Sequence, residues 1–167
     1  MAHSCMTFFG IDPGKTGAVA AIICVNGEVE ARVFDMPLDA DDRVDATGIA
    51  VLLSSNSVVP DRTMSCLEKA QAMPKQGVVG VFNYGIGYGA IRAALQIGMY
   101  PFQEISPMKW KKEFALIKKE KEDSVAVAHQ LFPNAPLFRD KRGGGKIILH
   151  GRAEALLMAE YCRRRMG

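Results

Sequence analysis

Cysteine is scarce in this sequence, and its four copies lie far apart, at Cys5, Cys24, Cys66 and Cys162. None of them forms a C-x-x-C pair, so the spacing offers no zinc site. A chain of 167 residues buries about two-thirds of its unfolded surface on folding, and it therefore needs no disulfide or structural metal. We expect a protein of a reducing, intracellular compartment.

Long apolar runs are also missing. No stretch approaches the ~20 apolar residues of a membrane span. No charged leader followed by a long apolar segment opens the chain, so we expect no secretory signal. The composition, with 49% apolar and 23% charged residues, is that of an ordinary globular protein. The length predicts one domain that spans residues 1–167.

A complete phosphate-binding loop is absent as well, although one stretch has part of it. The stretch "FFGIDPGKTG" ends in Gly14-Lys15-Thr16, the tail of such a loop, but Phe9 stands where the motif requires its first glycine. We therefore expect no nucleotide cofactor. What remains is Asp12, a carboxylate at the end of an apolar run.

The charge is distributed unevenly along the chain. Residues 1–100 hold 7 Lys/Arg and 10 Asp/Glu, whereas residues 101–167 hold 14 Lys/Arg and 8 Asp/Glu. A basic half fits a polyanionic partner. On charge alone, a solvated surface explains the pattern equally well.

The pattern of apolar residues and turns predicts an α/β domain with a mixed sheet flanked by helices. Asn26-Gly27 indicates a tight hairpin, so the sheet opens with antiparallel strands. The element order suits a ribonuclease H-like architecture. Predicted strands are residues 8–12, 18–25, 29–34, 62–67 and 101–105; predicted helices are 46–54, 86–98, one from 106, 120–131 and 148–165; predicted loops are the glycine-rich 76–89 and 134–146.

Four polar residues form a candidate site. Asp12 and Glu68 each end an apolar strand, and His150 lies four residues before Glu154 on one helical face. Hard oxygen ligands of this kind bind Mg²⁺ or Mn²⁺, and two such ions can promote phosphodiester cleavage. Taken singly, Asp12 could cap a turn, Glu68 and Glu154 could be solvated, and His150 could be structural. Spacing alone does not establish that the four lie together.

Four motifs give the sequence a family resemblance. They are "GIDPGKTGA", "EKAQAMPKQGV" with "FNYGIGYG" just after it, "SPMKWKKEF" and "HGRAEALLMAEY". Together they resemble the RuvC family of Holliday junction resolvases, particularly its phage and chloroplast branches. The motifs stand in the family's order from residue 7 to about residue 161.

The resemblance implies a metal-dependent endonuclease of DNA recombination and repair that nicks two opposed strands of a four-way junction. Asp12, Glu68, His150 and Glu154 match the four catalytic, metal-binding positions, with two Mg²⁺ or Mn²⁺ ions in each active site. Many members carry Asp where this chain has His150, although His occurs there in some branches. The resemblance also implies a homodimer in the cytoplasm of a bacterial or phage-infected cell, or in an organelle, with no membrane partner.

Basic and aromatic residues predict a DNA-facing surface. The lysines and the arginine could contact phosphates or be merely solvated, and the two aromatic residues could stack on splayed bases or pack under their loop or in the dimer interface. Trp110 is expected to anchor its segment rather than to bind a base. The candidates for DNA contact are Lys75, Phe82, Tyr84, Lys109, Lys111, Lys112, Lys118, Lys119, Lys141, Arg142 and Lys146.

Two other functions remain open on sequence. The histidine at position 150 leaves room for a junction-binding protein with weak or no catalysis. An actin-like kinase also opens with Gly-Ile-Asp and a glycine-rich turn, but it needs two such lobes, and 167 residues supply only one.

Overall fold

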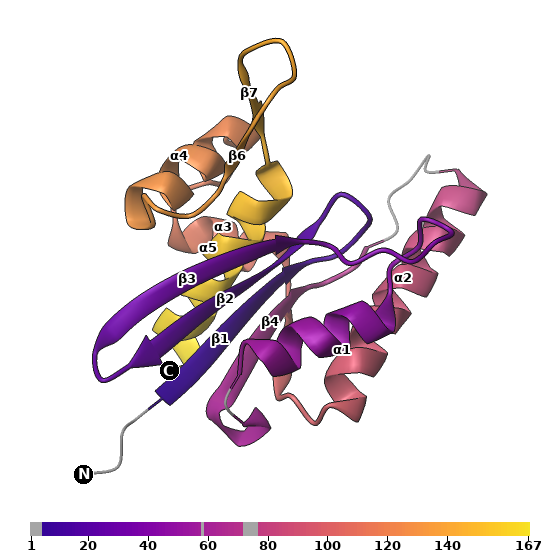
Figure 1. Cartoon of the computed structure of the whole chain (residues 1–167), viewed down its shortest axis with the longest axis horizontal. Coiled ribbons are helices and arrows are strands. Elements are labelled where there is room, and N and C mark those ends of the chain that lie inside the picture. The colour runs from indigo at the N-terminus through magenta and orange to yellow at the C-terminus, as the bar shows by residue number, and fades with distance from the viewer. Residues whose placement is uncertain (1–4, 58, 72–76) are drawn as a thin grey trace.

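The computed structural model describes residues 5–57, 59–71 and 77–167. Five strands form one sheet in the order β3-β2-β1-β4-β5 (Figure 1). β1 pairs antiparallel with β2 and parallel with β4, so the sheet is mixed, as the sequence predicts. The strands of this sheet are β1 (Cys5–Asp12), β2 (Ala18–Val25), β3 (Glu28–Asp35), β4 (Thr63–Glu68) and β5 (Phe102–Ile105).

Helices cover both faces of this sheet. In Figure 1, α1 and α2 lie over one face, and α5 crosses the other with α3 and α4 beside it. No helix in the described parts of the chain is both long and apolar enough to cross a membrane. The helices are α1 (Ala46–Ser55), the short 3-10 helix η1 (Pro60–Arg62), α2 (Val78–Ile97), α3 (Pro107–Glu113), α4 (Lys121–Leu131) and α5 (His150–Met166).

The β2–β3 turn follows the sequence prediction. Val25 pairs with Glu28, so the turn contains only Asn26 and Gly27. Their φ angles are 52° and 89°. Two positive φ angles are what a type I′ hairpin requires, and this pair of residues tolerates them.

Gly10 in β1 permits the close approach of α5 to the sheet. A Cβ atom at this position would lie 2.0 Å from the Ala155 carbonyl oxygen and 2.2 Å from the Ala159 backbone nitrogen. Its neighbours Phe8 and Phe9 are buried on opposite faces of the sheet. Because α5 begins at His150 and carries Glu154, this contact also sets the distance of those two side chains from β1.

Two predicted loops prove to be regular structure, and the prediction was wrong there. The glycine-rich stretch is helical from Val78, as the first half of α2. Ile91 and Leu95 anchor the second half of that helix in the core. Once a helix is anchored, each added residue contributes one backbone hydrogen bond, and here this outweighs the cost of ~1 kcal/mol for each glycine.

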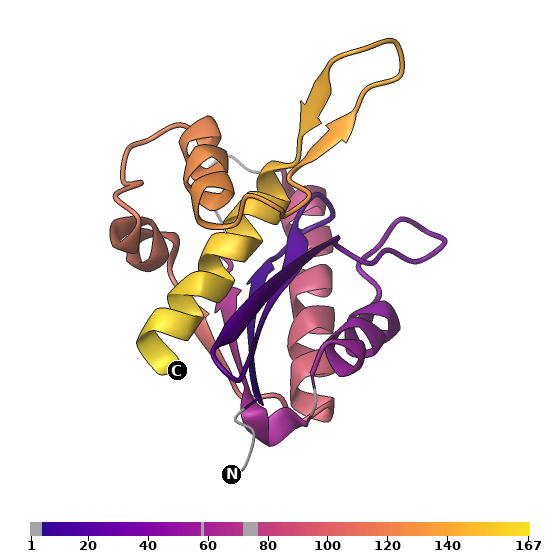
Figure 2. The same cartoon turned by 60° about the vertical axis from the view of Figure 1, so that its left-hand side comes forward.

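The second wrongly predicted loop contains a β-hairpin. β6 (Phe138–Asp140) pairs with β7 (Lys146–Ile148), and the hairpin projects from the domain in Figure 2. Three consecutive glycines, Gly143, Gly144 and Gly145, all adopt positive φ and close its tip. Ile148 belongs to β7, so the last helix begins two residues later than predicted.

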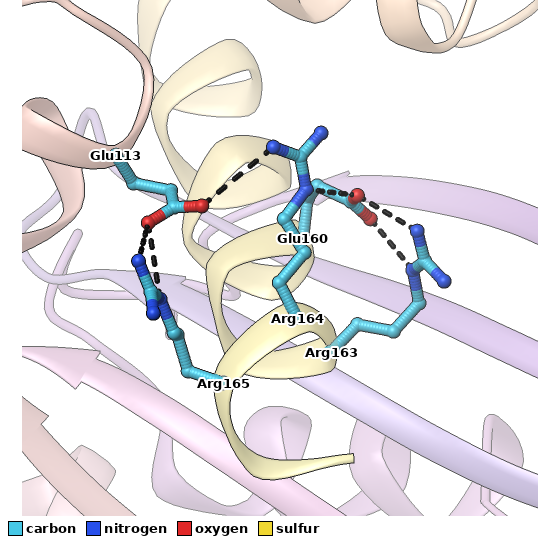
Figure 3. Close-up of polar contacts among 5 residues, drawn as sticks. All are labelled: Glu113, Glu160, Arg163, Arg164 and Arg165. Atoms are coloured by element: carbon cyan, nitrogen blue, oxygen red, sulfur yellow. Dashed lines mark hydrogen bonds and ion pairs between the residues drawn. The ribbon is translucent and has the colours of Figure 1, made fainter.

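A charged cluster joins α3 to the end of α5 (Figure 3). Glu160 is only 2% exposed, and it accepts hydrogen bonds from Arg163 at 2.8 Å and Arg164 at 2.7 Å. Glu113 of α3 accepts a 2.6 Å hydrogen bond from Arg165 and lies 3.7 Å from Arg164. Arg164 and Arg165 thus tie α3 to α5 through Glu113, whereas the bonds of Arg163 and Arg164 to Glu160 lie within α5.

We predict that Gly10→Ala destabilises the fold. Its methyl group would overlap the backbone of α5, and overpacking of this kind costs about 1–3 kcal/mol or more. The matched control is Gly89→Ala in α2, where a Cβ meets nothing within 4 Å. Alanine should stabilise that exposed helical site by up to ~1 kcal/mol. Urea unfolding measures both changes, and a Gly10→Ala protein as stable as wild type would contradict the close contact.

We also predict that Glu160→Gln weakens the fold in a pH-dependent way. Burial alone would raise the pKa of Glu160, but hydrogen bonds from Arg163 and Arg164 bring it below its ordinary value. Because the pKa of Glu160 is lower in the folded protein than in the unfolded chain, its ionised carboxylate stabilises the fold at any pH above the ordinary carboxyl pKa. This stabilisation is lost as the pH falls through the pKa of the folded state. We expect the free energy of unfolding of the Glu160→Gln protein to be about 1–3 kcal/mol lower than that of wild type at neutral pH. This difference should become smaller in acid.

The control for this change is Glu30→Gln, which removes an exposed carboxylate that also pairs with an arginine, Arg32. Exposed pairs contribute little, so this variant should match wild type. Thermal unfolding between acid and neutral pH measures both proteins. Equal stability of the Glu160→Gln protein and wild type across that range would show that the cluster does not secure the helix.

Candidate active site

Two carboxylates lie side by side at one edge of the sheet. β1 and β4 are adjacent and parallel, and their pairing ends at Ile11 with Leu67. Asp12 and Glu68 follow immediately, one on each strand. The sequence places each residue at the end of a strand, and the structure makes the two strands neighbours.

Glu154 adds a third carboxylate from α5, and its side chain is only 15% exposed. Burial raises the pKa of Asp12 well above its usual range, and the nearby carboxylates of Glu154 and Glu68 raise it further. Lys121 and Lys111 act in the opposite sense but do not cancel the effect. The three carboxylates therefore repel one another in a partly desolvated site, which favours the binding of positive charge.

Helix α3 contacts two of these carboxylates through consecutive residues. The indole nitrogen Nε1 of Trp110 donates a 2.7 Å hydrogen bond to Oε2 of Glu68. Lys111 Nζ lies 3.7 Å from Oε1 of Glu154. Burial raises the pKa of Glu68, and the Trp110 hydrogen bond counteracts part of this rise. Sequence reasoning anticipated Trp110 as an anchor but missed its contact with Glu68.

His150 lies in the same region without completing a ligand cluster. A hollow of about 400 Å³ is lined by Asp12, Glu154 and His150, together with Lys121, Arg139 and Arg152. His150 Nε2 is 3.9 Å from Oε1 of Glu122, on α4. Its Nδ1 is buried and has no hydrogen-bond partner among the described residues.

The residues present fit a divalent metal ion by their chemistry. Three carboxylates offer the hard oxygen donors that Mg²⁺ and Mn²⁺ prefer, and their mutual repulsion is what such an ion relieves. Within the described ranges, no three His, Cys, Asp or Glu side chains are already arranged as a ligand cluster. Asp12, Glu68 and Glu154 are thus the candidates to hold an ion, and His150 is a candidate fourth ligand.

The predicted phosphate contacts lie mostly on exposed surface. Lys109 and Lys112 line an open hollow that α3 shares with Tyr161 and Arg165 of α5, and Lys111 is half-buried. Lys75 falls outside the described residues. The exposed members elsewhere are Lys118 and Lys119 between α3 and α4, and Lys141, Arg142 and Lys146 on the hairpin.

Phe82 and Tyr84 stand on α2 rather than on a loop, which corrects their predicted setting. Phe82 is 67% exposed, and Tyr84 lines a second hollow, of about 650 Å³, with Lys15 and Arg43. Burial raises the pKa of Tyr84 to about 12, with smaller contributions from the carboxylates of Asp12 and Glu68. Tyr84 therefore lies beside the carboxylates. Lys15, in the stretch that resembles part of a phosphate-binding loop, pairs with Asp42. It lines both the hollow beside Tyr84 and the hollow beside Asp12 and His150.

Comparison with solved structures identifies the fold of this chain. None of the protein-family models and none of the curated protein sequences compared with the chain matches it. A Thermus thermophilus RuvC structure superposes with a TM-score of 0.61 at 20% identity, covering 95% of this chain and 96% of that one. A second structure, of T. thermophilus RuvC in complex with Holliday junction substrate, gives 0.60 at 18% identity, covering 97% of each chain. The chain therefore has the ribonuclease H-like fold of RuvC, a mixed five-stranded sheet flanked by helices.

Proposed function

We propose that this protein is a metal-dependent endonuclease that resolves four-way DNA junctions by paired nicks. The observation that carries the proposal is the convergence of Asp12, Glu68 and Glu154 from three elements at one sheet edge. The fold shared with RuvC over nearly the whole chain supports it, because one of those structures holds a Holliday junction substrate.

In this proposal, Asp12, Glu68 and Glu154 hold Mg²⁺ or Mn²⁺ ions, two in each active site. Such ions activate water and stabilise the leaving oxygen of a phosphodiester. His150, which lines the same hollow as Asp12 and Glu154, is proposed to ligate an ion or to accept a proton from water there. Lys121 and Lys111 offset part of the negative charge in the site.

The exposed lysines supply the attraction for DNA. Each phosphate that they neutralise adds salt-dependent affinity without reading sequence. Phe82, exposed on α2, has the setting to stack on a base displaced at the junction centre. Tyr84 lines a neighbouring hollow, and its phenol is protonated at neutral pH, so its hydroxyl can donate a hydrogen bond.

Two copies of the chain are proposed to act together. Paired nicks on a two-fold symmetric junction suit a two-fold symmetric enzyme. The proposed contact surface is α2, whose apolar side chains Val78, Val79, Ile86 and Ile97 are exposed. We also propose that the protein works in a reducing, intracellular compartment, as its four scattered cysteines suggest.

A second candidate function is junction binding with little or no cleavage. Lys111 Nζ, 3.7 Å from Oε1 of Glu154, already places a positive charge beside that carboxylate, and His150 stands where many RuvC relatives carry Asp. A protein of this kind would bind four-way junctions through the same lysines. It would fail to nick them in either Mg²⁺ or Mn²⁺.

We predict that Asp12→Asn abolishes junction cleavage and leaves junction binding intact. The change removes a carboxylate needed to hold the metal, whereas the basic surface supplies most of the affinity. The measurement uses synthetic junctions of varied core sequence in Mg²⁺ or Mn²⁺, with both nick positions mapped and binding measured in parallel.

Asp61→Asn is the matched control, because Asp61 precedes β4, at the end opposite Glu68, and is exposed. This variant should produce two symmetric nicks at the wild-type rate. Cleavage by Asp12→Asn at that same rate would refute the assigned site. If the wild-type protein binds junctions tightly but nicks neither strand, the second candidate function, junction binding without cleavage, would be favoured.

A further inference from the structure

Trp110 is the one tryptophan of the chain, and it lies completely buried at the candidate site. It belongs to α3, a helix whose other side chains include the exposed Lys109 and Lys112. The sequence therefore places a large apolar ring in the middle of a basic segment. Its hydrogen bond to Glu68 is the polar contact that sets it apart from the rest of the core.

An indole N–H is a donor only, so its single hydrogen bond has a single direction. At 2.7 Å from Nε1, Oε2 of Glu68 is held by a donor that cannot turn away, because the ring is enclosed by the core. The other carboxylate oxygen, Oε1, accepts no hydrogen bond from the described residues, so it can take another ligand. A carboxylate held through one oxygen in this way has a fixed orientation at the end of β4.

The next residue of α3 reaches the neighbouring carboxylate. Lys111 Nζ lies 5.2 Å from the centre of the Trp110 ring and 3.7 Å from Oε1 of Glu154. A lysine forms a loose, exchangeable contact with a carboxylate, and an entering cation can displace it. The Trp110 contact differs because nothing about it has to move when a cation arrives.

Helix α3 is itself held in place by contacts remote from the carboxylates. Glu113 binds Arg165 and lies near Arg164 of α5 (Figure 3). The Arg164 guanidinium also lies 5.1 Å from the centre of the Phe114 ring. These contacts do not involve the indole N–H. Removing that one donor should therefore leave the position of α3 unchanged, so its effect on Glu68 can be measured alone.

We propose that Trp110 is a positioning residue that orients the Glu68 carboxylate for a divalent cation and thereby sets the metal affinity of the site. The inference rests on the proposed function, since it assumes that Glu68 is a ligand. Partners that hold a ligand in place typically change metal affinity or activity by about 10–100-fold when they are removed. We expect a loss of that size without the N–H.

The sequence permits a change of one chemical group. Because Trp110 is the only tryptophan, biosynthetic replacement with 3-benzothienylalanine alters this position alone and exchanges N–H for sulfur in a ring of similar shape. Replacement with 5-fluorotryptophan is the matched control, because it keeps the N–H. Free Mn²⁺ is titrated by electron paramagnetic resonance in both proteins and in wild type. Junction cleavage is followed over the same Mn²⁺ range.

The benzothienyl protein should bind Mn²⁺ about 10–100-fold more weakly, with the cleavage midpoint shifted to match and the melting temperature close to that of the fluoro protein. Equal Mn²⁺ affinity in the two substituted proteins would overturn the role of Trp110 while junction cleavage by wild type still supports the proposed function. A wild type that neither binds Mn²⁺ nor cuts junctions would overturn both.

A second measurement needs no substituted ring and guards against poor folding of the benzothienyl protein. Mn²⁺ is paramagnetic, so its binding beside Glu68 should quench the emission of Trp110 in wild type, following the binding curve. The Asp12→Asn protein should lose this quenching at the same Mn²⁺ concentrations. Mn²⁺ binding by wild type that leaves Trp110 emission unchanged would overturn the proposal.

Discussion

Electrostatic repulsion among three carboxylates governs how the side chains around the candidate site are arranged. Asp12, Glu68 and Glu154 come from β1, β4 and α5. Burial raises the pKa of Asp12 and of Glu68, and the charge of Glu154 raises both further. Folding alone gains nothing from such an arrangement. The surrounding structure offsets the repulsion with Lys111, Lys121 and the Trp110 hydrogen bond, and it holds the carboxylates together all the same.

Contacts away from the carboxylates hold the elements that carry these side chains in place. Gly10 brings the backbone of α5 against β1, which determines how far Glu154 stands from Asp12. Glu113 of α3 binds Arg165 and lies near Arg164 at the far end of α5, and these contacts hold α3, which carries Trp110, in place. Both supports are short-range and rigid. The polar geometry at the sheet edge therefore follows from packing and ion pairs elsewhere in the molecule.

Much of this arrangement could be predicted from the sequence, and the limits have physical reasons. Asp12 and Glu68 end apolar runs, and such residues meet at one edge when their strands are parallel neighbours. His150 and Glu154 share a helical face by their spacing. The helix over the glycine-rich stretch escaped prediction because its anchors, Ile91 and Leu95, lie beyond the glycines, so tertiary packing overrides local propensity.

The contacts between the candidate site and its neighbours could not be predicted from the sequence, because they join residues that are far apart in the chain. Trp110 and Glu68 are separated by 42 positions, and nothing in either local motif pairs them. The spacing of His150 indicates its helical face but does not reveal that Glu122 of α4 lies 3.9 Å from its ring. The hairpin at Phe138–Ile148 was hidden because three glycines resemble an open loop, although their positive φ angles close a turn.

Anomalous diffraction from crystals soaked in Mn²⁺ would show whether the three carboxylates bind a cation, because it locates the ion without reference to cleavage. We expect a peak at the sheet edge, within roughly 2.0–2.2 Å of oxygens from Asp12, Glu68 and Glu154, as hard cations of this size require. Crystals of the Asp12→Asn protein should lack it. A wild-type crystal with Mn²⁺ bound only elsewhere, or with none bound at saturating concentration, would contradict the claim that these three carboxylates form a metal site.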